Sequence, residues 1–120
     1  MIEVINLNNI DLVSTNQRYI VYKGRMILSS KYRKFKEMLT FACTWEIIKG
    51  PYEVNIHIET HLDIDNCIKC ILDTLNKRVI DDDKNILILH IYKKKIKRNL
   101  PGNLRVLVGQ IDPIYPLIAL

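Results

Sequence analysis

The sequence predicts a single α+β domain in which a mixed β-sheet packs against two main helices. Segments with strand-like patterns alternate with two segments whose apolar residues recur at helical spacing. A chain of 120 residues is long enough to bury one core. The composition, 48% hydrophobic and 26% charged, is that of an ordinary soluble globular protein. We therefore expect residues 1–120 to form one domain.

The first half of the chain predicts a strand, a hairpin and a helix. Apolar residues near the start indicate a leading strand, and residues 18–29 carry β-formers on both sides of a turn at Lys23-Gly24. Residues 29–48 indicate a helix that Ser29 or Ser30 can cap and that Gly50-Pro51 ends. Its inward positions are expected to be Phe35, Met38, Leu39, Ala42 and Trp45.

The second half predicts three strands and a shorter helix. Residues 52–60 alternate strictly, as in a half-buried strand, and residues 66–77 are amphipathic. The inward positions of this helix are expected to be Ile68, Ile71, Leu72 and Leu75. Residues 85–93 are almost continuously apolar and indicate a central strand. Residues 104–111 offer one more strand, and the proline-broken tail, 112–120, is expected to lie over the surface or a partner.

Charge is unevenly distributed along this chain of net charge +5. Residues 60–85 hold four basic against six acidic residues, whereas the rest holds fourteen basic against seven acidic. A basic surround attracts phosphates and an acidic centre holds divalent cations, as an enzyme acting on a polyanion requires. A solvated charged loop explains the same distribution equally well.

The acidic residues fall into two groups separated by a helix. Asp63 and Asp65 follow a strand, and if the chain is still extended there, both carboxylates point the same way. Asp65 or Asn66 can cap the helix, on which Asp65, Lys69 and Asp73 share one face. The second group, 81–83, enters the next strand. Carboxylate oxygens suit Mg²⁺, and two such ions can stabilise a phosphodiester displacement that Lys69 assists.

The pattern "DIDNCIKCILDTLN" followed by "VIDDDKNI" resembles the RusA family of Holliday-junction resolvases. The upstream "STNQRY", "KGR" and "SSKYRKFKE" are similar to further elements of that family in the same order. The resemblance covers residues 14 to about 95. Three differences stand out. His61 and Leu62 precede the first aspartate where the family commonly has basic residues, the link between the helix and the following acidic pair is about one residue shorter, and Asp81 is an additional acid.

The resemblance implies metal ligation by Asp63, Asp65 and Asp83, with Lys69 as the active-site lysine. It also implies Mg²⁺ or Mn²⁺ dependence, a homodimer, and paired nicks in four-way DNA junctions. The choice among Asp81, Asp82 and Asp83 stays open. A simple strand–helix–strand crossover would place Asp83 at the opposite end of the sheet from Asp63. Either the crossover is not made, or the 77–83 loop doubles back, or a partner subunit completes the site.

Basic residues outside the acidic stretch are candidates for contacts with DNA phosphates. Cations in the first turns of the 29–48 helix oppose its dipole, so their presence there favours a functional role. The expected DNA-binding side chains are Asn16, Arg18, Lys23, Arg25, Lys31, Arg33 and Lys34. The basic run 93–98 is as compatible with a soluble strand end as with a backbone contact.

The cysteines and histidines favour a structural interpretation. Cys67 and Cys70 form a C-x-x-C pattern at a helix start, which His57 and His61 could complete as a zinc site, but the spacing is not that of a finger. His90 is expected to be a structural residue, and Phe35 and Trp45 core residues.

A metal-dependent endonuclease acting on branched DNA is thus the expected function. The chain has no membrane-spanning apolar run and no signal-like start, which favours the cytoplasm. Two alternatives remain: a junction-binding module without catalysis, and a structural protein whose acidic loop docks on a basic surface.

Overall fold

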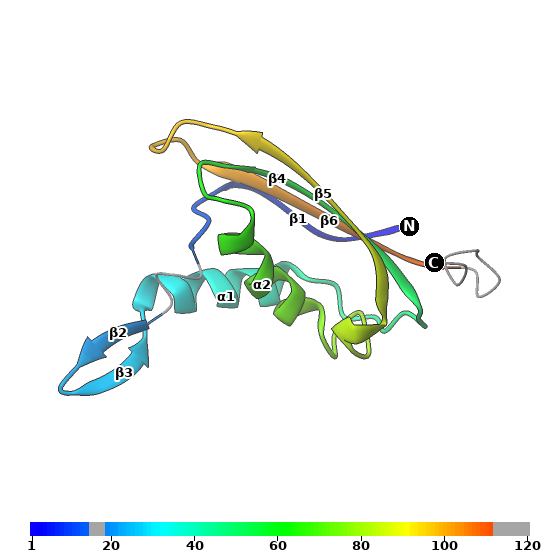
Figure 1. The fold of residues 1–120 in the computed structure, drawn as a ribbon, viewed down its shortest axis with the longest axis horizontal. Helices are drawn as coiled ribbons and strands as arrows, with labels where there is room; N and C mark the ends of the chain where they lie inside the picture. The colour runs from blue at the N-terminus through cyan, green and yellow to red at the C-terminus, as the bar shows by residue number, and fades with distance from the viewer. Residues whose placement is uncertain (15–18, 112–120) are drawn as a thin grey trace.

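The computed structural model describes residues 1–14 and 19–111. Two helices lie on one face of a four-stranded sheet, and a separate two-stranded hairpin projects away from it (Figure 1). The elements are β1 (Ile2–Ile10), β2 (Tyr19–Tyr22), β3 (Arg25–Leu28), α1 (Ser30–Ala42), β4 (Tyr52–Thr60), α2 (Asp65–Leu75), the 3-10 turn η2 (Asp83–Asn85), β5 (Ile86–Lys95) and β6 (Gly102–Gln110). No helix of the described residues is long and apolar enough to cross a membrane.

The sheet is mixed, with the strand order β1-β6-β4-β5. β6 pairs antiparallel with β1 and with β4, whereas β4 and β5 are parallel and joined through α2. The predicted α+β class is confirmed. The prediction that residues 85–93 form a central strand is wrong, because β6 inserts beside β4 and leaves β5 at an end of the sheet.

Helix α1 begins as predicted but ends earlier. The side chain of Ser29 accepts a hydrogen bond from the Tyr32 N–H at 3.1 Å, which confirms one of the two expected caps. The helix ends at Ala42 rather than running to residue 48, because the Thr44 N–H leaves the helical pattern to donate to the carbonyl of Val4 in β1. Trp45 is consequently outside the helix and 75% exposed, so its predicted core position is wrong.

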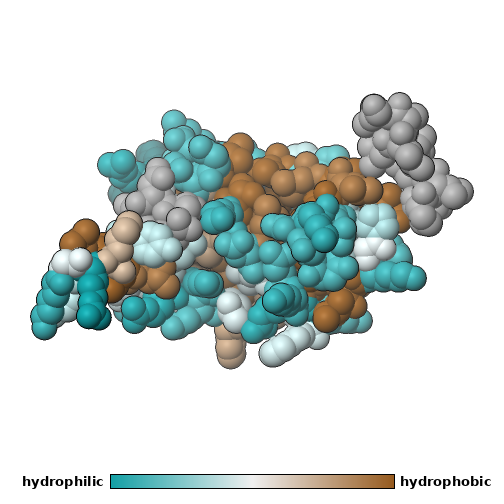
Figure 2. Space-filling model, turned by 60° about the horizontal axis from the view of Figure 1, so that its bottom comes forward, coloured by the Kyte–Doolittle hydropathy of each residue, from teal (hydrophilic) through white to brown (hydrophobic). Residues whose placement is uncertain are grey.

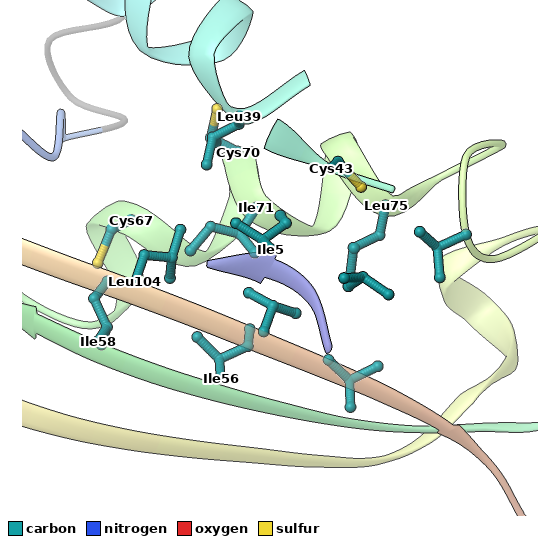
Figure 3. Packing of buried hydrophobic residues seen from close by; sticks show 14 of the residues in the cluster. Ile5, Leu39, Cys43, Ile56, Ile58, Cys67, Cys70, Ile71, Leu75 and Leu104 are labelled. Carbon is teal, nitrogen blue, oxygen red and sulfur yellow. The ribbon is translucent and has the colours of Figure 1, made fainter. Parts of the chain in front are cut away.

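The core lies between the helices and the sheet (Figure 3). The alternation in β4 is confirmed, since Val54, Ile56 and Ile58 are buried. In α2 the buried face is rotated relative to the prediction: Ile71 and Leu75 are buried, but Ile68 and Leu72 are only partly so. The remaining apolar positions of this face are occupied by Cys67 and Cys70.

The hairpin matches its prediction. Lys23 and Gly24 form the turn, and both have positive φ, as a two-residue hairpin turn with the right twist requires. Both strands lie at the surface, away from the sheet (Figure 1). The predicted DNA contacts Asn16 and Arg18, and the tail 112–120, lie outside the described residues.

Candidate active site

The first acidic pair lies where β4 passes into α2. The strand ends at Thr60, the chain bends at 61–62, and Asp65 occupies the first turn of the helix. The chain is therefore not extended at Asp63 and Asp65. An extended chain was the condition under which the two carboxylates were expected to point the same way. The N-cap is Ile64, without a side-chain cap, so the predicted capping by Asp65 or Asn66 is wrong. Asp65 nevertheless sits where the helix dipole favours a negative charge.

Asp63 borders an open depression of about 500 Å³ that also contains basic side chains. Lys31 reaches it from the first turn of α1, and Arg98 from the connection between β5 and β6. The same two cations line an adjoining hollow of about 140 Å³. His61 borders both, and Asn66 borders the first. A carboxylate and two cations thus face the same open space, where a phosphate and a metal ion could be held together.

The thiol of Cys67 lies next to the backbone of Asp63, the first residue of the acidic pair. Its Sγ is 3.4 Å from the carbonyl oxygen of Asp63. Burial raises the pKa of this thiol to about 11; the positive charge of Lys93 opposes the rise, and the Asp65 and Asp63 carboxylates add to it. Cys67 is therefore a neutral packing residue at neutral pH. The effect of Lys93, at the end of β5, is on the Cys67 thiol.

Lys69 follows the pair on α2 and is exposed, as are Asp65 and Asp73. This agrees with the expectation that the three share the outward face. Within the described residues, no ion pair joins Lys69 to either carboxylate. Its ammonium is therefore available to a bound phosphate.

Asp81, in the second acidic group, has a structural role. Its Oδ1 accepts hydrogen bonds from the Asp82 N–H at 2.7 Å and from Nδ2 of Asn85 at 3.0 Å, and the Tyr52 hydroxyl is 3.1 Å away. The bonds from Asn85 and Tyr52 hold the pKa of the Asp81 carboxyl below its usual value, against an opposing effect of desolvation. Asp81 thereby ties the start of β5 to the start of β4.

Asp82 is also engaged locally. Its side chain caps η2 by accepting from the Lys84 N–H at 3.0 Å. That bond, followed by one with the side chain of Asp83, holds the pKa of the Asp82 carboxyl low. Asp83 begins η2 and is exposed, so it is the member of the group that is best placed to meet a ligand.

The two acidic groups lie at opposite ends of the sheet. In the parallel pairing of β4 with β5, Tyr52 lies beside Ile86 and Thr60 beside Lys95. Asp63 follows the second end and Asp83 precedes the first. At about 3.3 Å per residue, the length of β4 separates them by roughly 26 Å. The described residues contain no group of three acidic, His or Cys side chains that could hold a metal ion. One chain alone therefore does not bring Asp83 together with Asp63 and Asp65.

The expected DNA-binding residues that the structure describes are all exposed. Lys31, Arg33 and Lys34 lie on the first turns of α1, and Lys23 and Arg25 lie at the tip of the hairpin. Sequence reasoning left the basic run 93–98 undecided between a strand end and a DNA-backbone contact, and it did not assign Arg98 to the site. The sequence did contain a signal for Arg98. A basic run that follows a strand parallel to β4 must emerge at the same end of the sheet as Asp63.

The structure argues against a zinc site. Cys67 and Cys70 are buried in the core, whereas His57 stacks on Tyr92 on the opposite face of the sheet, with ring centroids 4.7 Å apart. His90 lies on that same outer face and contacts the Glu53 carboxylate at 3.4 Å, in line with a structural role.

The chain was compared with protein families and with curated proteins. Residues 49–106 match the family described as Endodeoxyribonuclease RusA. A comparison with curated proteins finds no match. The matched stretch contains Asp63, Asp65, Lys69 and Asp83, together with β4, α2, β5 and the start of β6. This stretch, just under half of the chain, is similar to the RusA family of endodeoxyribonucleases.

Proposed function

We propose that the chain is a metal-dependent endodeoxyribonuclease that resolves four-way (Holliday) DNA junctions by paired symmetric nicks, in recombination and repair. The observation that carries this proposal is the placement of Asp63 and Arg98, both within the stretch that matches the family, in one open depression with Lys31. Cations beside a carboxylate suit a substrate that brings phosphates to a bound metal ion. The whole of residues 1–120 would act as a single RusA-like domain.

The proposed metal is Mg²⁺, with Mn²⁺ as a possible substitute. Mg²⁺ is commonly bound by one or two carboxylates together with water and substrate phosphate, and the exposed pair Asp63 and Asp65 fits this description. When bound, the metal would activate water and offset the charge that develops at the phosphate. Asp83 is proposed as a third ligand.

The protein's own residues would hold the DNA around that position. Lys31 and Arg98 would bind phosphates flanking the scissile bond, and Lys69, one helical turn after Asp65, would stabilise the negative charge of the reacting phosphate. Arg33, Lys34 and the hairpin residues Lys23 and Arg25 would extend the contact along the DNA backbone. Two symmetric nicks require two such sites at a fixed separation, which a homodimer provides.

The test is cleavage of a labelled synthetic four-way junction with Mg²⁺ and with EDTA. We compare the native chain with Asp65→Asn and with Asp73→Asn, a matched control that removes the same charge two helical turns away. The expected result is paired nicks that need metal, vanish in Asp65→Asn and persist in Asp73→Asn, while all three proteins bind the junction. Tight binding without cleavage by the native chain would indicate a binding module instead. If the native chain neither binds nor cuts the junction, the remaining explanation is that the acidic loop docks on a partner.

The binding of phosphates can be tested separately through its salt dependence. Removing one cation that binds a DNA phosphate is expected to reduce the slope of log affinity against log salt by about 0.9. Arg98→Ala and Lys31→Ala should show this reduction. Lys49→Ala, which removes an exposed cation before β4, should not.

A further inference from the structure

We propose that an open groove beside the second half of α1 binds unpaired, single-stranded DNA by stacking bases on Phe41 and Trp45. The groove has a volume of about 570 Å³. Besides the two aromatic rings, the described residues that line it are Lys36, Glu37, Thr40, Cys43 and Arg78. The inference rests on the proposed function in taking DNA as the nucleic acid. It goes beyond that function because the groove contains none of the proposed catalytic residues and requires no metal ion.

The two aromatic side chains of the groove are exposed to solvent. Phe41 is 94% exposed near the end of α1, and Trp45, in the segment that follows, is 75% exposed. Figure 2 shows hydrophilic residues over much of the side on which the helices lie. Leaving large aromatic rings in water forgoes the stabilisation that their burial would provide. Two such rings beside one groove therefore indicate a surface that a ligand covers.

The ring of Trp45 is held by Arg78. The guanidinium carbon of Arg78 lies 4.5 Å from the centroid of the ring, in a cation–π contact. A guanidinium that stacks through its flat face keeps its N–H groups in its own plane, where they can donate to a phosphate. Within the part of the chain that the structure describes, no carboxylate forms an ion pair with Arg78. One residue thus positions a stacking ring and offers a phosphate contact beside it.

The groove continues the basic side of α1 away from the candidate active site. Its two cations, Lys36 and Arg78, outnumber its one acid, Glu37, which favours a negatively charged ligand. Arg33, already proposed to contact DNA, lies on the same face one turn before Lys36. Lys31, which borders the Asp63 depression, begins this side of the helix, about 15 Å from Phe41 along the axis. A strand that leaves the candidate active site along α1 would therefore reach the groove.

The lining of the groove favours a nucleic acid over an acidic protein segment. Among the described residues that line it, there is no Leu, Ile, Val or Met to form a pocket for an apolar anchoring side chain. Flat aromatic rings beside cations are the features that bind unpaired bases and their phosphates. In paired DNA the bases are already stacked on their neighbours, so stacking on these rings selects an unpaired stretch.

The first experiment follows the fluorescence of Trp45, which is the one tryptophan of the sequence and so reports on the groove directly. The native chain is titrated in EDTA with an oligothymidylate of about 12 nucleotides. We expect saturable quenching, with an affinity that Phe41→Ala lowers about tenfold and Arg78→Ala also lowers. Tyr92→Ala, at a 54% exposed aromatic residue on the opposite face of the sheet, and Lys49→Ala are the matched controls and should bind like the native chain. Circular dichroism verifies the fold of each variant.

Two results of this titration would overturn the proposal. One is a native chain whose fluorescence the oligothymidylate does not quench, and the other is equal weakening by Phe41→Ala and Tyr92→Ala. Polyglutamate supplies negative charge without bases and is not expected to quench. Quenching by polyglutamate but not by the oligothymidylate would assign the groove to an acidic protein segment instead.

The second experiment relates the groove to the proposed function by comparing two four-way junctions, one fully paired and one with a single-stranded extension on an arm. In EDTA the native chain should bind the extended junction more tightly, and Phe41→Ala should lose that preference. A native chain that shows the preference but never cuts with Mg²⁺ would refute the nuclease function and support the groove. A native chain that cuts but binds both junctions equally would refute the groove and leave the nuclease function standing.

Discussion

The hydroxyl of Tyr52 connects the start of β4 to Asp81, a member of the second acidic group. The side chain is fully buried at the start of β4. Its single proton can be donated to either of two acceptors, the carbonyl oxygen of Ile48 or Oδ1 of Asp81, and its oxygen accepts from the Asp81 N–H at 3.1 Å. Replacing Tyr52 by Phe removes both bonds and leaves the Asp81 N–H without this partner.

The expected destabilisation is about 2 kcal/mol, since each of the two hydrogen bonds contributes about 1 kcal/mol. Urea unfolding, followed by circular dichroism at one protein concentration, measures this free energy. Tyr92→Phe is the matched control: that side chain is 54% exposed, and its change should stay within about 0.5 kcal/mol. Equal effects of the two substitutions would show that the contact between the Tyr52 hydroxyl and Asp81 does not stabilise the fold.

The pH dependence follows from the lowered pKa of Asp81. A carboxyl whose pKa is lower in the folded than in the unfolded chain stabilises the fold above its unfolded-state value of about 4. That contribution is lost as the pH falls through the folded-state value. The bond to Asn85 is the main cause of the shift and survives in Tyr52→Phe, whereas the Tyr52 bond does not. The difference in the free energy of unfolding between the native chain and Tyr52→Phe should therefore become smaller as the pH falls below about 4. A difference that becomes larger there would contradict the lowering of the Asp81 pKa by Tyr52.

Other substitutions test the packing. Leu39→Ala, at a fully buried position of α1, should lower the free energy of unfolding by about 2–5 kcal/mol, whereas Phe41→Ala, two residues further on, should change it by less than about 0.5 kcal/mol. Gly102→Ala should destabilise by at least about 1–3 kcal/mol, because its Cβ would lie 2.2 Å from the backbone oxygen of Glu59; unchanged urea unfolding would contradict that close approach. Cys67 should resist labelling by a thiol reagent at pH 8 until the chain unfolds, because its thiol is buried with a pKa of about 11; rapid labelling of this residue in the native protein would show that it is accessible.

Local features of the fold could be predicted from the sequence because their causes lie within a few residues. The cap of α1 needs only Ser29 and the next turn of chain, and the hairpin turn needs only Lys23 and Gly24. The inward face of β4 follows from strict alternation. The position of Asp63 and Asp65 at the end of that strand follows in the same way. The acidic pair and the lysine that follows it could thus be assigned to a strand end and a helix from the sequence alone.

Tertiary contacts decided what the local patterns left open. Trp45 fits a helical stripe, but Thr44 bonds to β1 and takes the chain out of the helix first. The strand 85–93 has the composition of a central strand, yet the later strand β6 occupies the place beside β4. Which of two neighbouring stripes on α2 is buried depended on where the sheet lies beneath it.

The acidic residues show the same division. The sequence by itself determined that aspartates flank α2 and that a parallel crossover would separate them, because those facts depend on residue order and strand direction. Only the tertiary structure decided that the crossover is made, that Tyr52 engages Asp81, and that Lys31 and Arg98 face Asp63. These outcomes depend on contacts between segments that are distant along the chain, and a local pattern does not determine which distant segment will arrive beside it.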